Sequence, residues 1–293
     1  MISEDILKKI RRIEIISKKS SSEVFAGEYH SAFRGRGMEF SEVREYYPGD
    51  EIRFIDWNVS SRMGKIYVKQ FVEERELTVI LAVDLSSSLN FYSGKKSKKD
   101  IAAEVSAIIA FTASINKDKV GLLLFTDKPE LFIPPKRGKT HLLRIIKEIL
   151  TFKPVSEGTS IENGLTYLNK VIKKKAIIFL ISDFLDGDFS LPLRISGRKH
   201  DLIAINILDR REREIPKEGI FRLRDAESGE EFLVDFSSEK TRRKFIEITQ
   251  RKRNLLAEQF SKYNVDSIDI SSDKDYEKSL FSFFMKRRKK YSR

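Results

Sequence analysis

The sequence has no cysteine and only three histidines among its 293 residues. Without cysteine the chain cannot form a disulfide, an iron–sulfur cluster or a thiolate zinc site, and it has no cysteine nucleophile. His30, His141 and His200 are never spaced as a metal-binding pair, so an imidazole-based metal site is not expected. Any metal bound by this chain would therefore need oxygen ligands.

Long apolar runs are missing as well. The uninterrupted ones, such as residues 176–181, are about six residues long, whereas a membrane-spanning helix needs roughly 20. The chain begins with an acidic stretch, unlike the basic start of a secretory signal. We therefore expect a soluble, cytoplasmic protein.

Glycine and proline are scarce, at 14 and 7 residues, while 40% of the residues are apolar and 34% are charged. This composition excludes a disordered, collagen-like or low-complexity chain. Lys and Arg total 56 against 44 Asp and Glu, which gives a net charge of +12. Nucleic acid, an acidic membrane surface or an acidic protein face would each suit this excess, and a solvated cationic surface without a partner is an equal alternative.

The composition and the hydrophobic pattern of the chain change near residue 75. Residues before that point are rich in Arg, Glu and aromatic side chains, with turn signals at 34–37 and 47–50. Beyond it, short apolar runs alternate with segments of helical periodicity. We predict strands at residues 77–83, 120–125, 130–133, 176–181, 202–208 and 267–270, and helices near 101–112, 141–150, 161–172, 239–263 and 276–290.

Alternating buried strands and helices predict an α/β sandwich around a mostly parallel sheet. Residues 221–224 and 231–234 flank a turn sequence, Glu-Ser-Gly-Glu, that is typical of a β-hairpin. We expect a smaller amino-terminal, β-containing region at 1–75 and an α/β domain at 76–293, with a hairpin insertion near 220–235.

Polar side chains follow two of the predicted strands. Asp84, Ser86 and Ser88 come directly after the first strand of the α/β domain, and Asp183 comes after the strand at 176–181. Thr159 precedes a predicted helix, of which either Thr159 or its neighbour would be the N-cap. Because ligands bind at the carboxyl ends of parallel strands, we expect these side chains to meet at one edge of the sheet.

These five groups are all hard oxygen ligands. Two carboxylates balance the charge of one divalent cation and hydroxyls add coordination without charge, which favours Mg²⁺ or Mn²⁺ over zinc. The alternative is that the hydroxyls only cap helices and the aspartates only end strands, as such residues often do.

The pattern resembles the metal-ion-dependent adhesion site of von Willebrand factor A domains, which consists of Asp-x-Ser-x-Ser, a later Thr and a later Asp. The resemblance implies a von Willebrand factor A-like three-layer sandwich. It also implies that Ser86, Ser88 and Thr159 are direct ligands, and that Asp84 and Asp183 hold the cation directly or through water.

A second resemblance covers nearly the whole chain. The segments RGRGMEF (34–40), VREYYPGDEIRFIDW (43–57), LDRREREIP (208–216) and DAESG (225–229) are similar to the domain-of-unknown-function 58 family. That resemblance implies a MoxR-type AAA+ ATPase as partner, with this chain as its co-chaperone or substrate adaptor. Many members begin with a transmembrane hairpin, which is missing here, so a soluble short form is implied.

The aromatic residues of the second segment, Tyr46, Tyr47, Phe54 and Trp57, are expected to pack in a core or interface, with a partner-binding face as the alternative. Pro48-Gly49 suits a turn in which Asp50 bonds nearby backbone N–H groups, and Arg53 could pair with Asp56.

Two basic clusters, 242–244 and 251–253, lie on a predicted helix that also carries Phe245, Ile248, Leu255 and Phe260. We expect a solvated cationic face outside a buried apolar stripe. The basic segment 286–290 is expected to be a frayed tail, with peripheral contact to anionic lipid or nucleic acid as the alternative.

No nucleophile–base pair and no phosphate-binding glycine loop is found in the sequence, so we do not expect an enzyme. The favoured function is a binding module whose Mg²⁺ or Mn²⁺ is completed by an acidic side chain of a MoxR-type ATPase or a client protein. A Mg²⁺-dependent hydrolase with a metal-bound water is one alternative. Nucleic-acid binding is another, but it is not expected because interleaved aromatic residues are missing.

Overall fold

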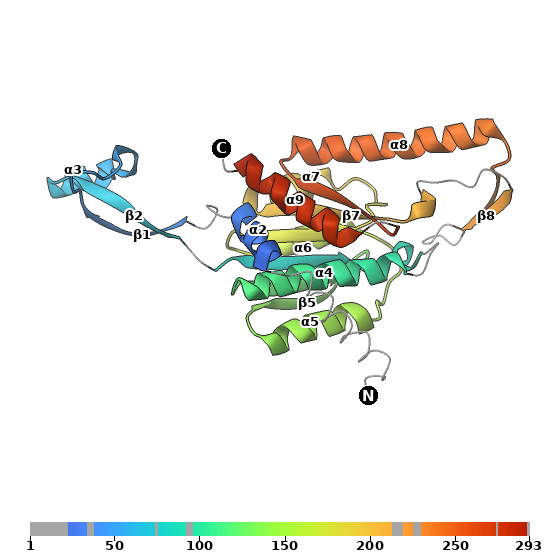
Figure 1. The fold of residues 1–293 in the computed structure, drawn as a ribbon, viewed down its shortest axis with the longest axis horizontal. Coiled ribbons are helices and arrows are strands. Elements are labelled where there is room, and N and C mark those ends of the chain that lie inside the picture. Colours follow the sequence, from blue (N-terminus) through green and yellow to red (C-terminus); the bar gives the residue numbers. More distant parts are fainter. Residues whose placement is uncertain are drawn as a thin grey trace. The chain divides into compact units, whose positions relative to one another are not determined.

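The computed structural model describes residues 23–33, 38–73, 76–91, 96–212, 219–224, 230–273 and 275–291 (Figure 1). The chain divides into two compact units. The small unit is Phe33–Leu77, and the large unit joins the described residues before it to those after it. All five predicted metal ligands belong to the large unit.

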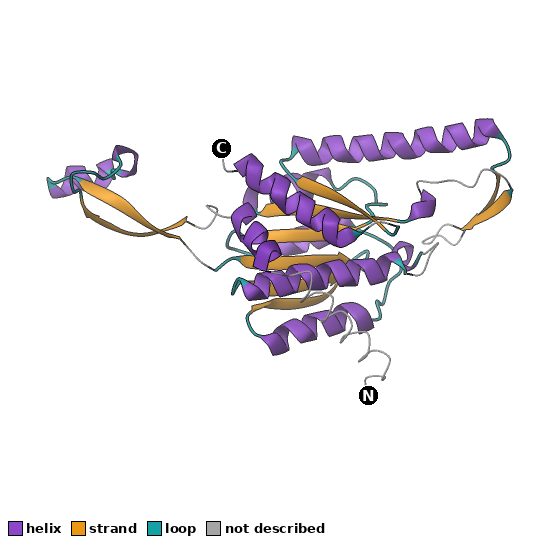
Figure 2. Ribbon diagram, in the orientation of Figure 1, coloured by secondary structure: helices purple, strands orange, loops and turns teal. Residues whose placement is uncertain are grey.

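Six strands form the sheet of the large unit, in the order β10-β7-β6-β3-β4-β5 (Figure 2). Neighbouring strands run parallel except for β4 and β5, which are antiparallel. The predicted α/β fold with a mostly parallel sheet is therefore confirmed. The strands are β3 (Thr78–Asp84), β4 (Lys119–Phe125), β5 (Pro129–Lys136), β6 (Ile177–Ser182), β7 (Asp201–Leu208) and β10 (Asp266–Ser271).

Helices cover both faces of this sheet and make three layers. In Figure 1, α4, α5 and α9 lie in front of the sheet and α6 and α7 lie behind it. Strands β6 and β7 are buried along their whole length because both of their faces are covered. The helices are α2 (Glu23–Phe33), α4 (Lys98–Ile115), α5 (Lys139–Thr151), α6 (Ile161–Val171), α7 (Ser190–Lys199), α8 (Glu239–Lys262) and α9 (Tyr276–Tyr291). No helix in the described ranges is long and apolar enough to cross a bilayer.

Helix α7 is absent from the sequence-based prediction. It has a proline in its first turn, which a helix tolerates there because the first N–H groups have no intrahelical partner. Gly197 lets α7 approach the end of α8, since a Cβ at this position would lie 2.5 Å from the carbonyl oxygen of Tyr263. This close approach is a tertiary requirement that the local pattern does not reveal.

In the small unit, β1 (Met38–Glu45) and β2 (Tyr67–Glu73) form an antiparallel pair. The 3-10 helix η1 (Ile52–Phe54) and α3 (Trp57–Met63) connect them. Asp50 accepts a hydrogen bond from the backbone N–H of Tyr47 at 2.8 Å, as predicted. The predicted pair between Arg53 and Asp56 is wrong: the Asp56 carboxylate caps α3 through the N–H groups of Asn58 and Val59, and Arg53 pairs with Glu51.

The first boundary between the regions differs from the expected one. Helix α2 falls inside the predicted region 1–75, yet it packs with the large unit. The rings of Phe25 and Tyr29 lie 5.4 and 5.6 Å from that of Phe284 in α9, and the Tyr29 hydroxyl donates to Asp118 at 3.2 Å. Burial of these aromatic rings explains why α2 joins the large unit.

The predicted hairpin is present as β8 (Ile220–Arg224) and β9 (Glu231–Asp235), paired antiparallel. Residues 227–229 of its predicted turn, the turn at 34–37, and residues 213–216 and 225–229 of the family-like segments lie outside the described residues.

Candidate functional site

Strands β3 and β6 bring the two predicted carboxylates to one edge of the sheet. The strands pair in parallel, with Val83 opposite Ile181. Asp84 ends β3 and is fully buried, and Asp183 follows β6 with 5% of its surface exposed. The predicted meeting of the strand ends is therefore found, and both carboxylates lie away from bulk water.

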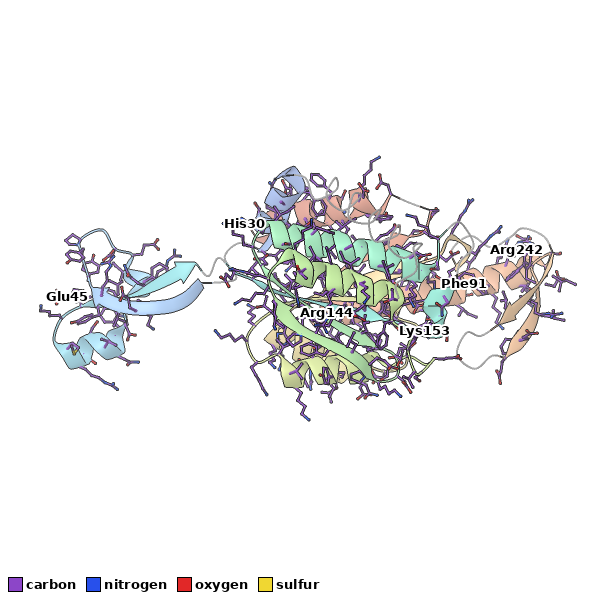
Figure 3. All side chains as sticks on the ribbon, turned by 90° about the horizontal axis from the view of Figure 1, so that it is seen from below. His30, Glu45, Phe91, Arg144, Lys153 and Arg242 are labelled. Atoms are coloured by element: carbon purple, nitrogen blue, oxygen red, sulfur yellow. The ribbon has the colours of Figure 1, made fainter. Side chains whose placement is uncertain are left out.

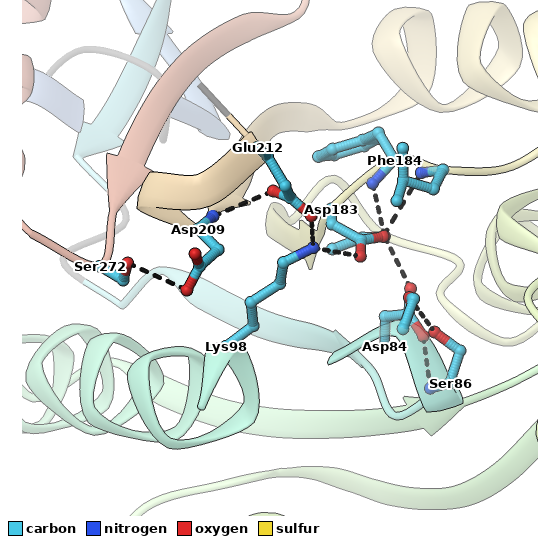
Figure 4. Close-up of polar contacts among 11 residues, drawn as sticks. Asp84, Ser86, Lys98, Asp183, Phe184, Asp209, Glu212 and Ser272 are labelled. Atoms are coloured by element: carbon cyan, nitrogen blue, oxygen red, sulfur yellow. Dashed lines mark hydrogen bonds and ion pairs between the residues drawn. The ribbon is translucent and has the colours of Figure 1, made fainter. Parts of the chain in front are cut away.

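The loop after β3 folds back on Asp84 (Figure 4). The backbone N–H of Ser86 donates to Asp84 Oδ1 at 2.8 Å. The hydroxyl oxygens of Ser86 and Ser88 lie 3.1 Å apart. Asp84, Ser86 and Ser88 thus form one cluster of buried oxygen atoms, in which alternate residues of the loop face the same way.

Thr159 lies in the loop that precedes α6. The N-cap of this helix is Ser160, whose hydroxyl accepts from the N–H of Asn163 at 3.2 Å. The N–H of Ser87 donates to the carbonyl oxygen of Glu157 at 2.9 Å. This bond holds the Thr159 loop against the serine loop, so the third predicted segment is also at this edge of the sheet.

Ser182 connects the two strand ends, and the sequence-based prediction of the site did not include it. Its hydroxyl donates to Asp84 Oδ2 at 2.7 Å and accepts from the N–H of Phe184 at 3.0 Å. Ser182 therefore orients the Asp84 carboxylate and the turn that carries Asp183. Its position directly before Asp183 at the end of an apolar strand was the available signal.

A buried lysine, Lys98, lies beside Asp183 and was not expected from the sequence. It is the first residue of α4, and its side chain is 1% exposed. Its ammonium lies 3.0 Å from Asp183 Oδ2 and forms a second ion pair with Glu212, the last residue of η3 (Arg210–Glu212). Sequence reasoning missed Lys98 because a lysine at the start of a helix usually faces solvent.

The charges of these groups influence one another. Burial lowers the pKa of Lys98, but the negative charges of Asp183 and Glu212 outweigh burial and raise that pKa above its ordinary value. Burial also raises the pKa of the Asp84 carboxyl to about 7, and the charge of Asp183 adds to this rise, while hydrogen bonds from Ser182 and Ser86 oppose it. Burial disfavours the ionised form of such a carboxyl group, and a nearby cation stabilises that ionised form.

The donor set suits a hard divalent cation in its chemistry. The Asp84 carboxylate lies in one cluster with the hydroxyls of Ser86 and Ser88, the charge of Asp183 acts on Asp84, and magnesium prefers such oxygen ligands. Across the described ranges, no group of three or more His, Asp or Glu side chains is placed to hold a metal ion. The hydroxyls would therefore have to complete the coordination.

Two aromatic residues of the small unit do not pack in a core as expected. Tyr47 and Trp57 are each 64% exposed. In the described residues of this unit, two strands, a 3-10 helix and one short α-helix offer too little surface to bury them. The partner-binding alternative for this face stays a prediction.

Helix α8 also differs from its prediction. Ile248 and Leu255 of the expected buried stripe are 47% and 56% exposed, whereas Phe260 is buried. The first part of α8 packs instead against Phe236, the residue that follows β9, whose ring lies 5.7 Å from that of Phe245 and 5.7 Å from that of Phe221 in β8. Arg242, labelled in Figure 3, donates from this part of α8 to the carbonyl oxygen of Ser237 at 2.9 Å.

The basic segment 286–290 belongs to the ordered helix α9 and is not frayed. Arg287 is buried and pairs with Asp201 and Asp266. Arg288 pairs with Glu28, and Lys290 pairs with Asp266. Much of the charge of this segment is therefore satisfied within the fold.

The fold and the strand-end cluster define an α/β protein with a mostly parallel sheet and an acidic, hydroxyl-rich site at the carboxyl ends of its strands. A family model described as "Protein of unknown function DUF58" matches residues 42–255. The chain belongs to this family, as its motifs predict.

Relatives of similar length are found in mycobacteria. The chain is 29% identical over 285 residues to the uncharacterized protein Rv1480 of Mycobacterium tuberculosis and to Mb1516 of Mycobacterium bovis, covering 96% of this chain and 89% of each relative. Among solved structures, it is similar to BatB of Bacteroides thetaiotaomicron (12% identity, 73% of this chain and 99% of that chain, TM-score 0.44). It is also similar to the SpRpn10 VWA domain (16% identity, 71% of this chain and 93% of that chain, TM-score 0.37).

Proposed function

We propose that the chain is a non-enzymatic protein-interaction module whose strand-end cluster binds Mg²⁺ or Mn²⁺ and presents it to an acidic side chain of a partner. The observation that carries this proposal is the buried cluster of Asp84, Ser86 and Ser88, linked through Ser182 to the end of β6. Asp183 and Thr159 complete the proposed ligand set. A bound cation here would keep a coordination position for a ligand from outside the chain.

The partner that the family resemblance suggests is a MoxR-type AAA+ ATPase, with this chain as its co-chaperone or adaptor. The chemistry on this side of the interface is consistent with an acidic ligand, since the chain carries a net charge of +12. A carboxylate from the partner would be attracted by the positive net charge of the chain and then bound by the metal. A cytoplasmic location is part of the same proposal.

Calorimetry on metal-stripped protein tests the metal site. Mg²⁺ should bind the wild type, and the Asp84→Ala, Asp183→Ala double variant should bind it at least about tenfold more weakly, because both charged ligands are lost. The matched control is Asp188→Asn, which removes a carboxylate that also follows β6 but accepts hydrogen bonds from the N–H and the hydroxyl of Ser190. No binding at millimolar Mg²⁺, or equal binding by the double variant, contradicts the proposal.

Capture of a purified MoxR-type ATPase tests the partner. Capture should occur in Mg²⁺ and should be lost in chelator at constant salt or with Asp84→Ala. If chelation leaves capture intact while raised salt abolishes it, the basic surface alone attracts the partner and the metal-dependent mechanism is wrong.

A further inference from the structure

Lys98 lies next to the proposed cation site, where burial and the dipole of α4 both disfavour its positive charge. Its ammonium is buried between two carboxylates, 3.0 Å from Asp183 Oδ2 and paired with Glu212 on the other side (Figure 4). It also stands at the first position of α4, where the helix dipole disfavours a positive charge. Burying an ammonium costs several kcal/mol unless it is well paired, so packing alone does not explain a lysine here.

Glu212 is held firmly on its side of the contact. Its second carboxylate oxygen accepts from the N–H of Asp209 at 3.0 Å. Asp209 in turn accepts from the N–H of Arg211 at 2.8 Å and from the hydroxyl of Ser272 at 3.3 Å. The segment after β7 therefore fixes one partner of Lys98, while the proposed metal site supplies the other.

The charges of the two proposed aspartate ligands, Glu212 and Lys98 sum to a value that one divalent cation would balance. With their carboxyl groups ionised, Asp84, Asp183 and Glu212 contribute three negative charges, and the ammonium of Lys98 removes one. A net charge of minus two remains, which one Mg²⁺ or Mn²⁺ would neutralise. Without Lys98 the same carboxylates would carry minus three and would attract a cation more strongly.

We propose that Lys98 competes with the divalent cation for Asp183 and thereby sets the affinity of the site, with Glu212 drawing the ammonium away from it. This inference rests on the proposed metal site and names a residue that regulates it. Lys98 is not a ligand: it acts through the carboxylate that it shares with the metal.

The decisive measurement is the Mg²⁺ affinity of two opposed variants, determined by calorimetry. Lys98→Met keeps the length of the side chain but removes its charge, so Mg²⁺ should bind about tenfold more tightly or better. Glu212→Gln leaves Lys98 with Asp183 as its charged partner, so Mg²⁺ should bind several-fold more weakly. A purely structural lysine would not shift the affinity in opposite directions in the two variants.

Lys96→Met is the matched control. Lys96 precedes the same helix and pairs with Glu104 at 2.6 Å, so its replacement should leave the Mg²⁺ affinity unchanged. Because Lys98→Met leaves Asp183 and Glu212 without their shared cation, it could fail to fold. The double variant Lys98→Met, Glu212→Gln removes one charge of each sign and keeps the test available, and it should also bind Mg²⁺ more tightly than the wild type.

Each result separates this inference from the proposed function. Wild-type binding of Mg²⁺ together with unchanged affinity in the double variant and in Glu212→Gln overturns the role of Lys98 but leaves the metal site standing. If neither the wild type nor any Lys98 variant binds Mg²⁺, the proposed metal site itself is wrong. Tighter binding without Lys98 and weaker binding without the Glu212 charge supports the inference.

Discussion

Phe284 of α9 and Trp57 of α3 are both large aromatic residues on helices, but Phe284 is fully buried and Trp57 is 64% exposed. The two units also differ in how far their paired arginine side chains are buried. Arg287 of the large unit is paired at 1% side-chain exposure, whereas the pair of Arg44 with Asp50 in the small unit leaves 34% of the arginine side chain exposed. The large unit has helical layers on both faces of its sheet that exclude water, whereas the described part of the small unit has a two-stranded sheet with one short α-helix and a 3-10 helix.

This difference in burial means that the side chains of the two units contribute differently to stability. Buried, paired charges and aromatic rings hold the large unit together and place the candidate site at the edge of its sheet. Exposed aromatic residues contribute little to the stability of the small unit, since their burial is incomplete. Substitutions in the two units should therefore change different properties.

The largest effect is expected for Phe284→Ala. Removing a fully buried ring that contacts Phe25 and Tyr29 should lower the free energy of unfolding by about 4 kcal/mol, because it creates a cavity where α2 meets α9. Urea unfolding followed by circular dichroism measures it. A loss below about 1 kcal/mol would mean that the contact of α2 with the large unit is dispensable.

Arg287→Met should cost about 3 kcal/mol, because it leaves the carboxylates of Asp201 and Asp266 without their buried cation. Arg44→Met is the matched change in the small unit. The free energy of unfolding that Arg44→Met loses should be much smaller, since water can solvate Asp50.

The two units can be followed separately. The only tryptophan lies in the small unit, so fluorescence reports on that unit while circular dichroism follows the helices. Equal losses in the two variants would remove the contrast between the units.

His200 should make the large unit sensitive to acid. Burial lowers the pKa of this histidine to about 4, and the charge of Lys199 adds to the shift. The unfolded chain then binds the proton more readily below pH 6.5, so stability falls as the pH drops from 6.5 toward 4.

Relative to His200→Asn, the wild type should lose about 2 kcal/mol of stability between pH 7.5 and pH 5. Comparing the two proteins cancels the opposite contribution of Asp84, whose raised pKa favours the folded state at low pH. Within the small unit, Arg44 holds the pKa of Asp50 near 2, so that pair should stay charged over this range. A difference that does not vary with pH would contradict the role of His200.

The smallest effect is expected for Trp57→Ala. An exposed side chain can be removed with a change within about 0.5 kcal/mol, although this is the largest side chain of the small unit. Thermal unfolding followed by circular dichroism measures the change. A loss above about 2 kcal/mol would show that Trp57 is part of a core.

Much of the large unit could be predicted because its signals are local. A buried strand in a parallel sheet must be apolar along its length, so the runs at β3, β6 and β7 are visible in the sequence. The candidate cluster at Asp84 and Asp183 followed from the same rule, because parallel strands end at the same edge. Helix α7 was missed since its early proline and its glycine weaken the helical pattern.

The sequence by itself determined the buried strands and most helices of the large unit, the family and the residue types at the strand ends, because these depend on neighbours along the chain. Only the tertiary structure decided that Lys98 is buried between Asp183 and Glu212, which lie 85 and 114 residues away from it. It also decided that Trp57 and Leu255 are exposed, although their apolar character suggested burial. The physical reason is the same in each case: burial depends on which distant elements pack over a side chain, and the local pattern does not contain that information.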